Sequence, residues 1–320
     1  MKVVPIDLSL IDFNDLTFFT GNSDKNILSS LQESINEIGL LNPPILKDKG
    51  ESYQILTGWK RLISSRELGH TQALSSIYEA GEISDEECIK IIYQDNRYRI
   101  SELELSELIM LFRDLCSLDY KELINNVLPL FELPPSRRHL DKFLGLASLE
   151  KEIKDSFYRG NITIEQAKML SELTPESRGA VLSDVILKYR LNNNEARQVV
   201  SSIEEIALRD KKPASQVISD IEKALQDEKK GKNELRQQLK RIRYPALSEV
   251  EEKYRKEVDN LNLPKEVNLF INQFFEGNDI EFRIKIKSPE ELSRILSSLE
   301  NSLHSGGVKK LLDILKHGHE

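Results

Sequence analysis

Cysteine is scarce in this chain of 320 residues, which has only Cys88 and Cys116. The two lie far apart and lack the spacing of a metal site, so we expect buried thiols rather than a disulfide scaffold. Long apolar runs are also missing, and no signal peptide opens the sequence. These absences predict a cytoplasmic protein without membrane contact.

An excess of positive charge is absent as well. The chain has 45 basic and 53 acidic residues, for a net charge of -8. This balance excludes a protein coated in positive charge, but a local basic patch is enough for DNA binding. With 39% hydrophobic and 31% charged residues, the chain is expected to be globular, with two or three domains.

The most informative segment is a glycine between an expected strand and an expected helix. The strand covers residues 53–56, and apolar residues at helical spacing resume at Leu62. Gly58 lets the backbone approach a ligand closely, and the first N–H groups of the helix favour an anion. Lys60 and Arg61 stand in that first turn, where cations oppose the helix dipole, so a bound phosphate would explain them. A solvated corner is the alternative.

Two other segments flank this corner. Upstream, Gly39 ends an expected helix that begins near Asn26, and two prolines then force an extended chain. Downstream, an expected strand over residues 89–93 leads to a helix that begins near Ser101. Between them, Asp95 and Asn96 offer oxygen ligands of the kind that Mg²⁺ accepts when phosphates complete its shell. In the same segment, an arginine at position 99 is suited to a forked contact with phosphate.

Together these segments resemble the N-terminal domain of the ParB partition family, which shows G-[LI]-[LI]-Q-P, G-E-R-R and E-N-x-x-R in that order. Here they read Gly39-Leu40-Leu41-Asn42-Pro43, Gly58-Trp59-Lys60-Arg61 and Asp95-Asn96-Arg97-Tyr98-Arg99. The resemblance implies a sulfiredoxin-like fold that binds CTP with Mg²⁺. It also implies that the nucleotide is held by Gly58, Lys60, Arg61, Asn96 and Arg99, and the metal by Asp95 and Asn96.

Trp59 stands where the family usually has glutamate. We expect the indole to pack in the core, and stacking on a base is the alternative. Sulfiredoxin chemistry needs a cysteine at the phosphate turn, and none stands there. CTP hydrolysis is left open, and no catalytic residue is assigned.

The middle of the chain, from residue 101 to about residue 213, is almost wholly helical in pattern. Pro134 and Pro135 separate a helix over residues 120–130 from a second helix that Ser136 caps. This order is typical of a helix-turn-helix, whose second helix lies in the major groove, and in ParB proteins such a unit follows the nucleotide domain. A helical hairpin with a basic solvated tip is the alternative. The expected DNA contacts are Ser136, Arg137, Arg138, His139 and Lys142.

After a turn at residues 277–279, the segment 280–288 alternates apolar and charged residues, as a half-buried strand does. A helix follows from Ser288 or Pro289. A lone strand cannot bury its own edges, and ParB C-terminal domains resemble this strand-then-helix pattern and dimerise through it. The alternatives are that the strand joins the N-terminal sheet or a neighbouring hairpin.

The expected fold class is therefore α+β and mostly helical. It comprises a ParB/sulfiredoxin-like α/β nucleotide-binding domain (1–100), an all-helical helix-turn-helix domain (101–213), a charged helical linker (214–264) and a small strand-helix dimerisation domain (265–320).

The resemblance implies a dimeric, CTP-responsive clamp on double-stranded DNA. It would act in DNA partition or nucleoid organisation, in the nucleoid-associated cytoplasm, and an ATPase partner is left open. One alternative is a DNA-binding transcriptional regulator whose nucleotide site has decayed. The other is a phosphotransferase of the same fold, in which the base would be Glu33, Glu37, Glu67 or Asp95.

Overall fold

The computed structural model describes residues 2–21, 25–225, 231–271 and 279–317. The chain forms two compact units, Met1–Arg197 and Gln198–Glu320, which are described separately. The expected α+β, mostly helical fold class is confirmed. The finer domain boundaries at residues 100, 213 and 264 stay predictions.

The first unit opens with a five-stranded mixed sheet in the order β1-β5-β3-β4-β2. β1 runs antiparallel to β5, and β3 runs antiparallel to β4. β3 is parallel to β5, and β2 is parallel to β4. The sheet residues pack on α2 through a cluster that includes Leu46, Ile55, Trp59 and Leu62. The elements of this region are β1 (Lys2–Asp7), η1 (Leu8–Leu10), β2 (Ile11–Asp12), α1 (Lys25–Ile38), β3 (Ile45–Asp48), β4 (Tyr53–Thr57), α2 (Trp59–Glu67), β5 (Gln72–Tyr78) and α3 (Asp85–Asn96).

The predicted strand over residues 89–93 is wrong, because these residues lie in α3. Ser84 and Glu87 form a capping box, in which each side chain accepts a hydrogen bond from the other residue's N–H group. The residues that α3 buries follow helical spacing: Cys88, Ile89, Ile92 and Tyr93. A short apolar run fits either a strand or a buried helix, and here the capping box at Ser84 is the feature that indicates a helix.

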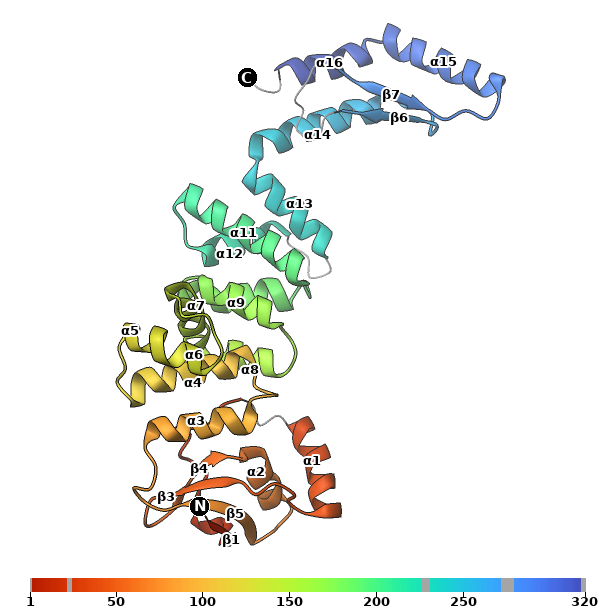
Figure 1. The fold of residues 1–320 in the computed structure, drawn as a ribbon. Coiled ribbons are helices and arrows are strands. Elements are labelled where there is room, and N and C mark those ends of the chain that lie inside the picture. Colours follow the sequence, from red (N-terminus) through yellow and green to blue (C-terminus); the bar gives the residue numbers. More distant parts are fainter. Residues whose placement is uncertain (1, 22–24, 226–230, 272–278, 318–320) are drawn as a thin grey trace. The chain divides into compact units, whose positions relative to one another are not determined.

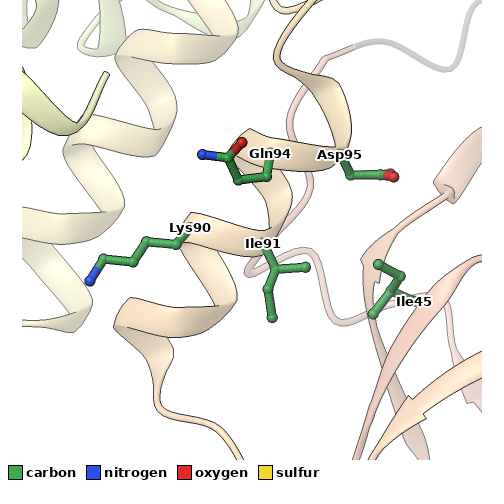
Figure 2. A pocket seen from close by; sticks show the side chains of 5 residues that line it. All are labelled: Ile45, Lys90, Ile91, Gln94 and Asp95. Atoms are coloured by element: carbon green, nitrogen blue, oxygen red, sulfur yellow. The ribbon is translucent and has the colours of Figure 1, made fainter. Parts of the chain in front are cut away.

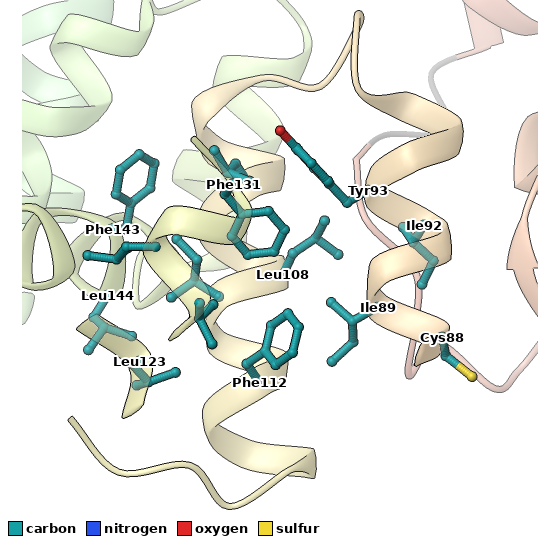
Figure 3. Close-up of a cluster of buried hydrophobic side chains, with 14 of the residues drawn as sticks. Cys88, Ile89, Ile92, Tyr93, Leu108, Phe112, Leu123, Phe131, Phe143 and Leu144 are labelled. Atoms are coloured by element: carbon teal, nitrogen blue, oxygen red, sulfur yellow. The ribbon is translucent and has the colours of Figure 1, made fainter. Parts of the chain in front are cut away.

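The rest of the first unit is helical, as predicted. α3, α4 and α7 share one apolar core (Figure 3), and the chain passes from α5 to α6 through a π-helical turn. The elements are α4 (Glu102–Leu115), α5 (Tyr120–Glu122), η2 (Leu123–Val127), α6 (Leu128–Leu130), α7 (Arg137–Ala147), α8 (Lys151–Tyr158), α9 (Ile164–Glu172), α10 (Pro175–Ala180), η3 (Val181–Leu187) and α11 (Asn193–Asp210), the last of which runs into the second unit.

In the second unit, α12 packs on α13, and α14 packs on α16. The predicted strand is shorter than expected and pairs antiparallel with β6, a strand that the sequence did not predict. The alternative of a neighbouring hairpin is thus confirmed for this strand. Residues 277 and 278 of the expected turn lie outside the described residues. The elements are α12 (Ala214–Leu225), α13 (Lys232–Arg243), α14 (Pro245–Asn260), β6 (Val267–Phe270), β7 (Glu281–Ile284), α15 (Pro289–His304) and α16 (Gly307–His317).

Over the described residues, no helix combines the length and the apolar character needed to cross a membrane. Both cysteines are free thiols, with Cys88 buried and Cys116 partly buried, as the sequence suggests.

Candidate functional site

The glycine corner between β4 and α2 has the geometry that the sequence predicts. Gly58 is the N-cap of α2, with φ at +86°, a conformation that side chains disfavour. A Cβ atom at this position would lie 2.8 Å from the Cβ atom of Pro44. Glycine is therefore required twice, for its backbone conformation and for space. Because Pro44 directly follows the Gly-Leu-Leu-Asn-Pro segment, the first two sequence motifs meet here.

The start of α2 presents unsatisfied polar groups. No side chain caps the helix, and its first backbone bond runs from the Leu62 N–H group to the Gly58 carbonyl. The N–H groups of residues 59–61 therefore have no acceptor within the helix. Beside them, the buried hydroxyl of Thr57 has no hydrogen-bond partner among the described residues. Phosphate oxygens would accept hydrogen bonds from all of these donors.

Arg61 joins the three sequence segments. Its guanidinium donates one hydrogen bond to the carbonyl of Asn42, and its Nη2 atom lies 3.4 Å from Oδ2 of Asp95. Burial lowers the pKa of Arg61; the Asp95 charge raises it, and the nearby Arg99 charge lowers it further. An arginine stays protonated, so Arg61 carries its positive charge at a partly buried position beside a second arginine. An additional anion would stabilise it.

The end of α3 supplies oxygen atoms for a metal. The amide nitrogen of Asn96 donates to the Ile92 carbonyl at 2.9 Å, which leaves the amide oxygen of Asn96 for another partner. The backbone then turns, and the Arg99 N–H group donates to the carbonyl of Asn96. Asp95 and Asn96 suit Mg²⁺ when phosphates and water complete the shell. No group of three or more His, Cys, Asp or Glu side chains forms a metal site by itself within the described ranges.

A shallow hollow of about 300 Å³ adjoins Asp95 (Figure 2). Ile91 on α3 and Ile45 on β3 face each other across it, and Lys90 and Gln94 complete its lining. Sequence reasoning missed these α3 residues because it assigned 89–93 to a strand. The spacing of positions 90, 91, 94 and 95 places them on one face of a helix and would have grouped them.

The candidate side chains of α2 differ in whether they face the corner. Trp59 is only 8% exposed and packs edge-on against Phe19, with ring centroids 5.0 Å apart, so its predicted core packing is confirmed. Glu67 lies at the opposite end of α2 and accepts a hydrogen bond from Gln32 at 2.6 Å. Lys60, in contrast, is partly exposed in the first turn of α2, as predicted.

The predicted DNA-reading helix is α7. Ser136 caps it, accepting from the N–H group of His139, and its hydroxyl also lies 2.8 Å from that imidazole. Arg137 and Arg138 are exposed in the first turn, although Arg137 also lies 3.6 Å from a carboxylate one turn later. Lys142 is held by the Glu102 carboxylate at 2.7 Å. The two arginines are therefore more available for contacts with DNA than the lysine is.

No protein-family model matches the chain. It is 26% identical over 183 residues to the "probable chromosome-partitioning protein ParB" of Campylobacter jejuni, covering 57% of this chain and 63% of that protein. It is 24% identical over 216 residues to the "probable plasmid-partitioning protein ParB" of Xylella fastidiosa, covering 66% of this chain and 51% of that protein. The chain is thus similar to proteins named as ParB partition proteins.

The chain spans 63% of the length of the first of these relatives and 51% of the second. It also matches a crystal structure of the C-terminally truncated Caulobacter crescentus ParB complexed with CTP-gamma-S. The identity is 17%, the TM-score is 0.27, and the match covers 57% of this chain and 100% of that one. The same protein complexed to the centromeric parS site matches at 18% identity with a TM-score of 0.29, covering 61% and 96%.

Proposed function

We propose that this protein is a ParB-like, nucleotide-responsive, DNA-binding partition protein that holds the triphosphate of CTP at the glycine corner. The observation that carries the proposal is the position of Arg61. Its guanidinium reaches both the segment before β3 and the end of α3, so one side chain joins all three motifs. A ligand that contacts Arg61 therefore acts on three parts of the chain at once.

Local charge supports an anionic ligand. Lys60 and Arg61 stand at the start of α2, and Arg99 is close enough for its charge to lower the pKa of Arg61. Asp95 is the carboxylate that faces Arg61, and it offsets one of these three charges. The unpaired N–H groups of the helix add further positive potential. A triphosphate is the cellular ligand that best matches so many donors in one place.

Mg²⁺ would be held by Asp95 and Asn96, and when bound it would neutralise charge on the phosphate oxygens. Asp95 would then exchange its contact with Arg61 for the metal, which frees the guanidinium for phosphate. Gly58, Lys60 and Arg99 would complete the nucleotide contacts. Hydrolysis is a separate matter, because the buried indole of Trp59 cannot activate water where the family has glutamate.

DNA would be read by α7, with Arg137 and Arg138 at the base edges and Ser136, His139 and Lys142 closer to the backbone. We further propose a homodimer formed through residues 265–320, with nucleoid association and an ATPase partner as in partition systems. The exposed apolar side chains of this region support an interface: Phe270 at 42%, Ile286 at 48%, Leu296 at 53% and Leu303 at 63%.

The test of the proposed function is equilibrium binding of labelled CTP and ATP, with and without Mg²⁺, to the purified chain. We expect saturable binding of CTP that Mg²⁺ strengthens, and weaker binding of ATP. DNA captured from the source genome, sequenced with and without CTP, should show sites whose occupancy depends on the nucleotide. No saturable binding of either nucleotide at millimolar concentration would overturn the nucleotide part.

The buried Trp59 favours a second candidate, a DNA-binding regulator whose nucleotide site has decayed. It predicts a DNA footprint that no nucleotide changes. The phosphotransferase alternative predicts turnover that is indifferent to DNA. Of its candidate bases, Asp95 lies at the corner, Glu67 lies at the far end of α2, and Glu33 and Glu37 lie on α1.

A further inference from the structure

The turn between the two helices of the helix-turn-helix touches the end of α3. The ring of Phe131, the first residue of this turn, packs edge-on against Tyr93, with centroids 4.7 Å apart. It also meets Phe112 of α4 at 5.8 Å, and Figure 3 shows Tyr93 pointing from α3 toward this aromatic group. Tyr93 lies two residues before Asp95. The candidate metal ligand and the turn before α7 are thus connected by one packed contact.

A second contact lies beside the first. The Arg97 guanidinium donates to the carboxylate of Glu132, the next residue of the turn. Arg97 directly follows Asn96, so the two contacts flank the candidate metal ligands on both sides. We call these two contacts, Tyr93–Phe131 and Arg97–Glu132, the joint.

Glu132 holds its carboxylate in place at a conformational cost. Its φ is +60°, in the left-handed region. The Leu133 N–H group donates to the Leu128 carbonyl at 2.9 Å, and the Glu132 N–H group donates to Pro129 at 3.0 Å. This is the Schellman pattern of a helix end, in which glycine is the usual residue at the position of Glu132. These two hydrogen bonds fix the backbone from which the Glu132 carboxylate reaches Arg97.

We propose that the joint couples the nucleotide site to the DNA-reading helix, with Arg97 and Glu132 as positioning residues. This inference rests on the proposed function. A nucleotide and metal that draw Asp95 away from Arg61 would shift the last turn of α3. The joint would pass that shift to residues 131–132, and the short segment up to Ser136 would pass it to the start of α7. By linkage, DNA that repositions α7 would change nucleotide affinity by the same factor.

The ion pair is open to solvent, since the side chains of Arg97 and Glu132 are 37% and 65% exposed. An exposed pair supplies at most about a fivefold effect. The aromatic contact is buried, because Tyr93 is 5% and Phe131 is 3% exposed. We therefore expect the ion pair to align the buried aromatic contact, so that the joint transmits the shift fully only while the pair is intact.

The experiment measures the Kd for DNA without and with saturating CTP and Mg²⁺, and the ratio of the two is the coupling factor. The variants are Arg97→Glu, Glu132→Arg and the double exchange. We expect each single reversal to lower the coupling factor about three- to fivefold, while each ligand alone binds within about twofold of wild type. The double exchange should restore the factor. Glu249→Lys with Lys253→Glu, an exposed ion pair on α14 that takes no part in the joint, is the control.

A further variant separates coupling from folding. Glu132→Gly removes the carboxylate and relieves the left-handed conformation, so the coupling factor should fall while the unfolding temperature stays equal or rises. An unchanged coupling factor in this variant and in both single reversals overturns the inference. Wild-type protein that binds both ligands without any coupling also overturns it. Wild-type protein that binds no nucleotide instead contradicts the proposed function, so the two failures are distinguishable.

Discussion

At the residue scale, Gly58 and Arg61 carry most of the account, and the sequence predicted the place of both. Glycine between a strand and a helix has few explanations, and the contact with Pro44 gives the structural one. Sequence could not show that Arg61 reaches Asn42 and Asp95, because these contacts join segments 19 and 34 residues away. The pairing of Lys142 with Glu102 was hidden for the same reason, since the two are 40 residues apart.

Alanine at Gly58 and at Gly69 should distinguish a steric clash of the added Cβ atom from the strain of a positive φ. Gly58→Ala adds a Cβ atom 2.8 Å from Pro44 at a φ of +86°, whereas Gly69→Ala adds one at +79° with nothing within 4 Å. We expect the first to destabilise the fold by about 2–3 kcal/mol and to abolish CTP binding, and the second to cost about 1 kcal/mol without affecting binding. Thermal unfolding and nucleotide titration measure both. Equal effects of the two variants would contradict the packing argument.

The arginines of α7 give a second prediction at this scale. Arg138→Ala should weaken specific DNA binding by about 1–3 kcal/mol, because an arginine can make two hydrogen bonds to a guanine edge. Lys142→Ala should have a smaller effect, since that lysine is engaged by Glu102. Fluorescence anisotropy with the recovered DNA site measures both affinities. A larger loss for Lys142→Ala than for Arg138→Ala would show that α7 presents a different face to DNA.

At the element scale, helices were predicted better than strands. Capping residues and long periodic patterns mark helices locally: the predicted cap at Ser136 is confirmed, and a helix does begin at Ser101. α3 was misread because residues 89–93 contain three isoleucines and a tyrosine, and a segment this short has no decisive period. β6 was missed because it is only four residues long, and its pairing with β7 is a non-local event.

The contact between α4 and α8 predicts a pH effect. Glu107 of α4 lies 3.1 Å from Lys154 of α8, and Tyr158 and Glu104 are its other charged or titratable neighbours. Burial raises the pKa of Glu107 above the ordinary 4.5, which the Lys154 charge only partly reverses. Folded protein therefore holds this proton more tightly than unfolded protein. Its contribution to stability is present below pH 4.5 and is lost as the pH rises through the raised pKa.

Glu107→Gln should remove this dependence. The difference in unfolding temperature, wild type minus variant, should decline as the pH rises from about 4 toward neutrality. Thermal unfolding across that range measures it. A difference that grows with pH would mean that the attraction of Lys154 outweighs burial and that the pKa of Glu107 is lowered instead.

At the scale of the whole molecule, the family resemblance predicted more than any pattern in the chain. Composition indicated a globular protein with several domains, but the net charge of -8 argued against a surface rich in DNA contacts. What sequence alone could not supply is the pairing of subunits, because the strand β7 finds its partner β6 within the same chain. The proposed dimer would use the exposed apolar side chains of α15 in this region.

Leu296 and Leu303 test this interface. Both lie on α15 and are 53% and 63% exposed, so Leu296→Glu with Leu303→Glu should place charge on the proposed contact and yield monomers. Ser293→Glu, at an exposed polar position of the same helix, should leave the dimer intact. Light scattering after size exclusion reports the mass. A double variant that stays dimeric would locate the interface elsewhere.

The most direct test of the central claim compares two arginines of one helix by CTP titration. Arg61 opens α2 at the glycine corner, whereas Arg66 lies in its last turn and stacks on Phe13 at 3.9 Å. We predict that Arg61→Ala raises the Kd for CTP with Mg²⁺ by roughly ten- to a hundredfold, the value of a lost charge-assisted hydrogen bond, while Arg66→Ala leaves it unchanged. Binding of CTP by Arg61→Ala with wild-type affinity would contradict the claim that the triphosphate sits at this corner.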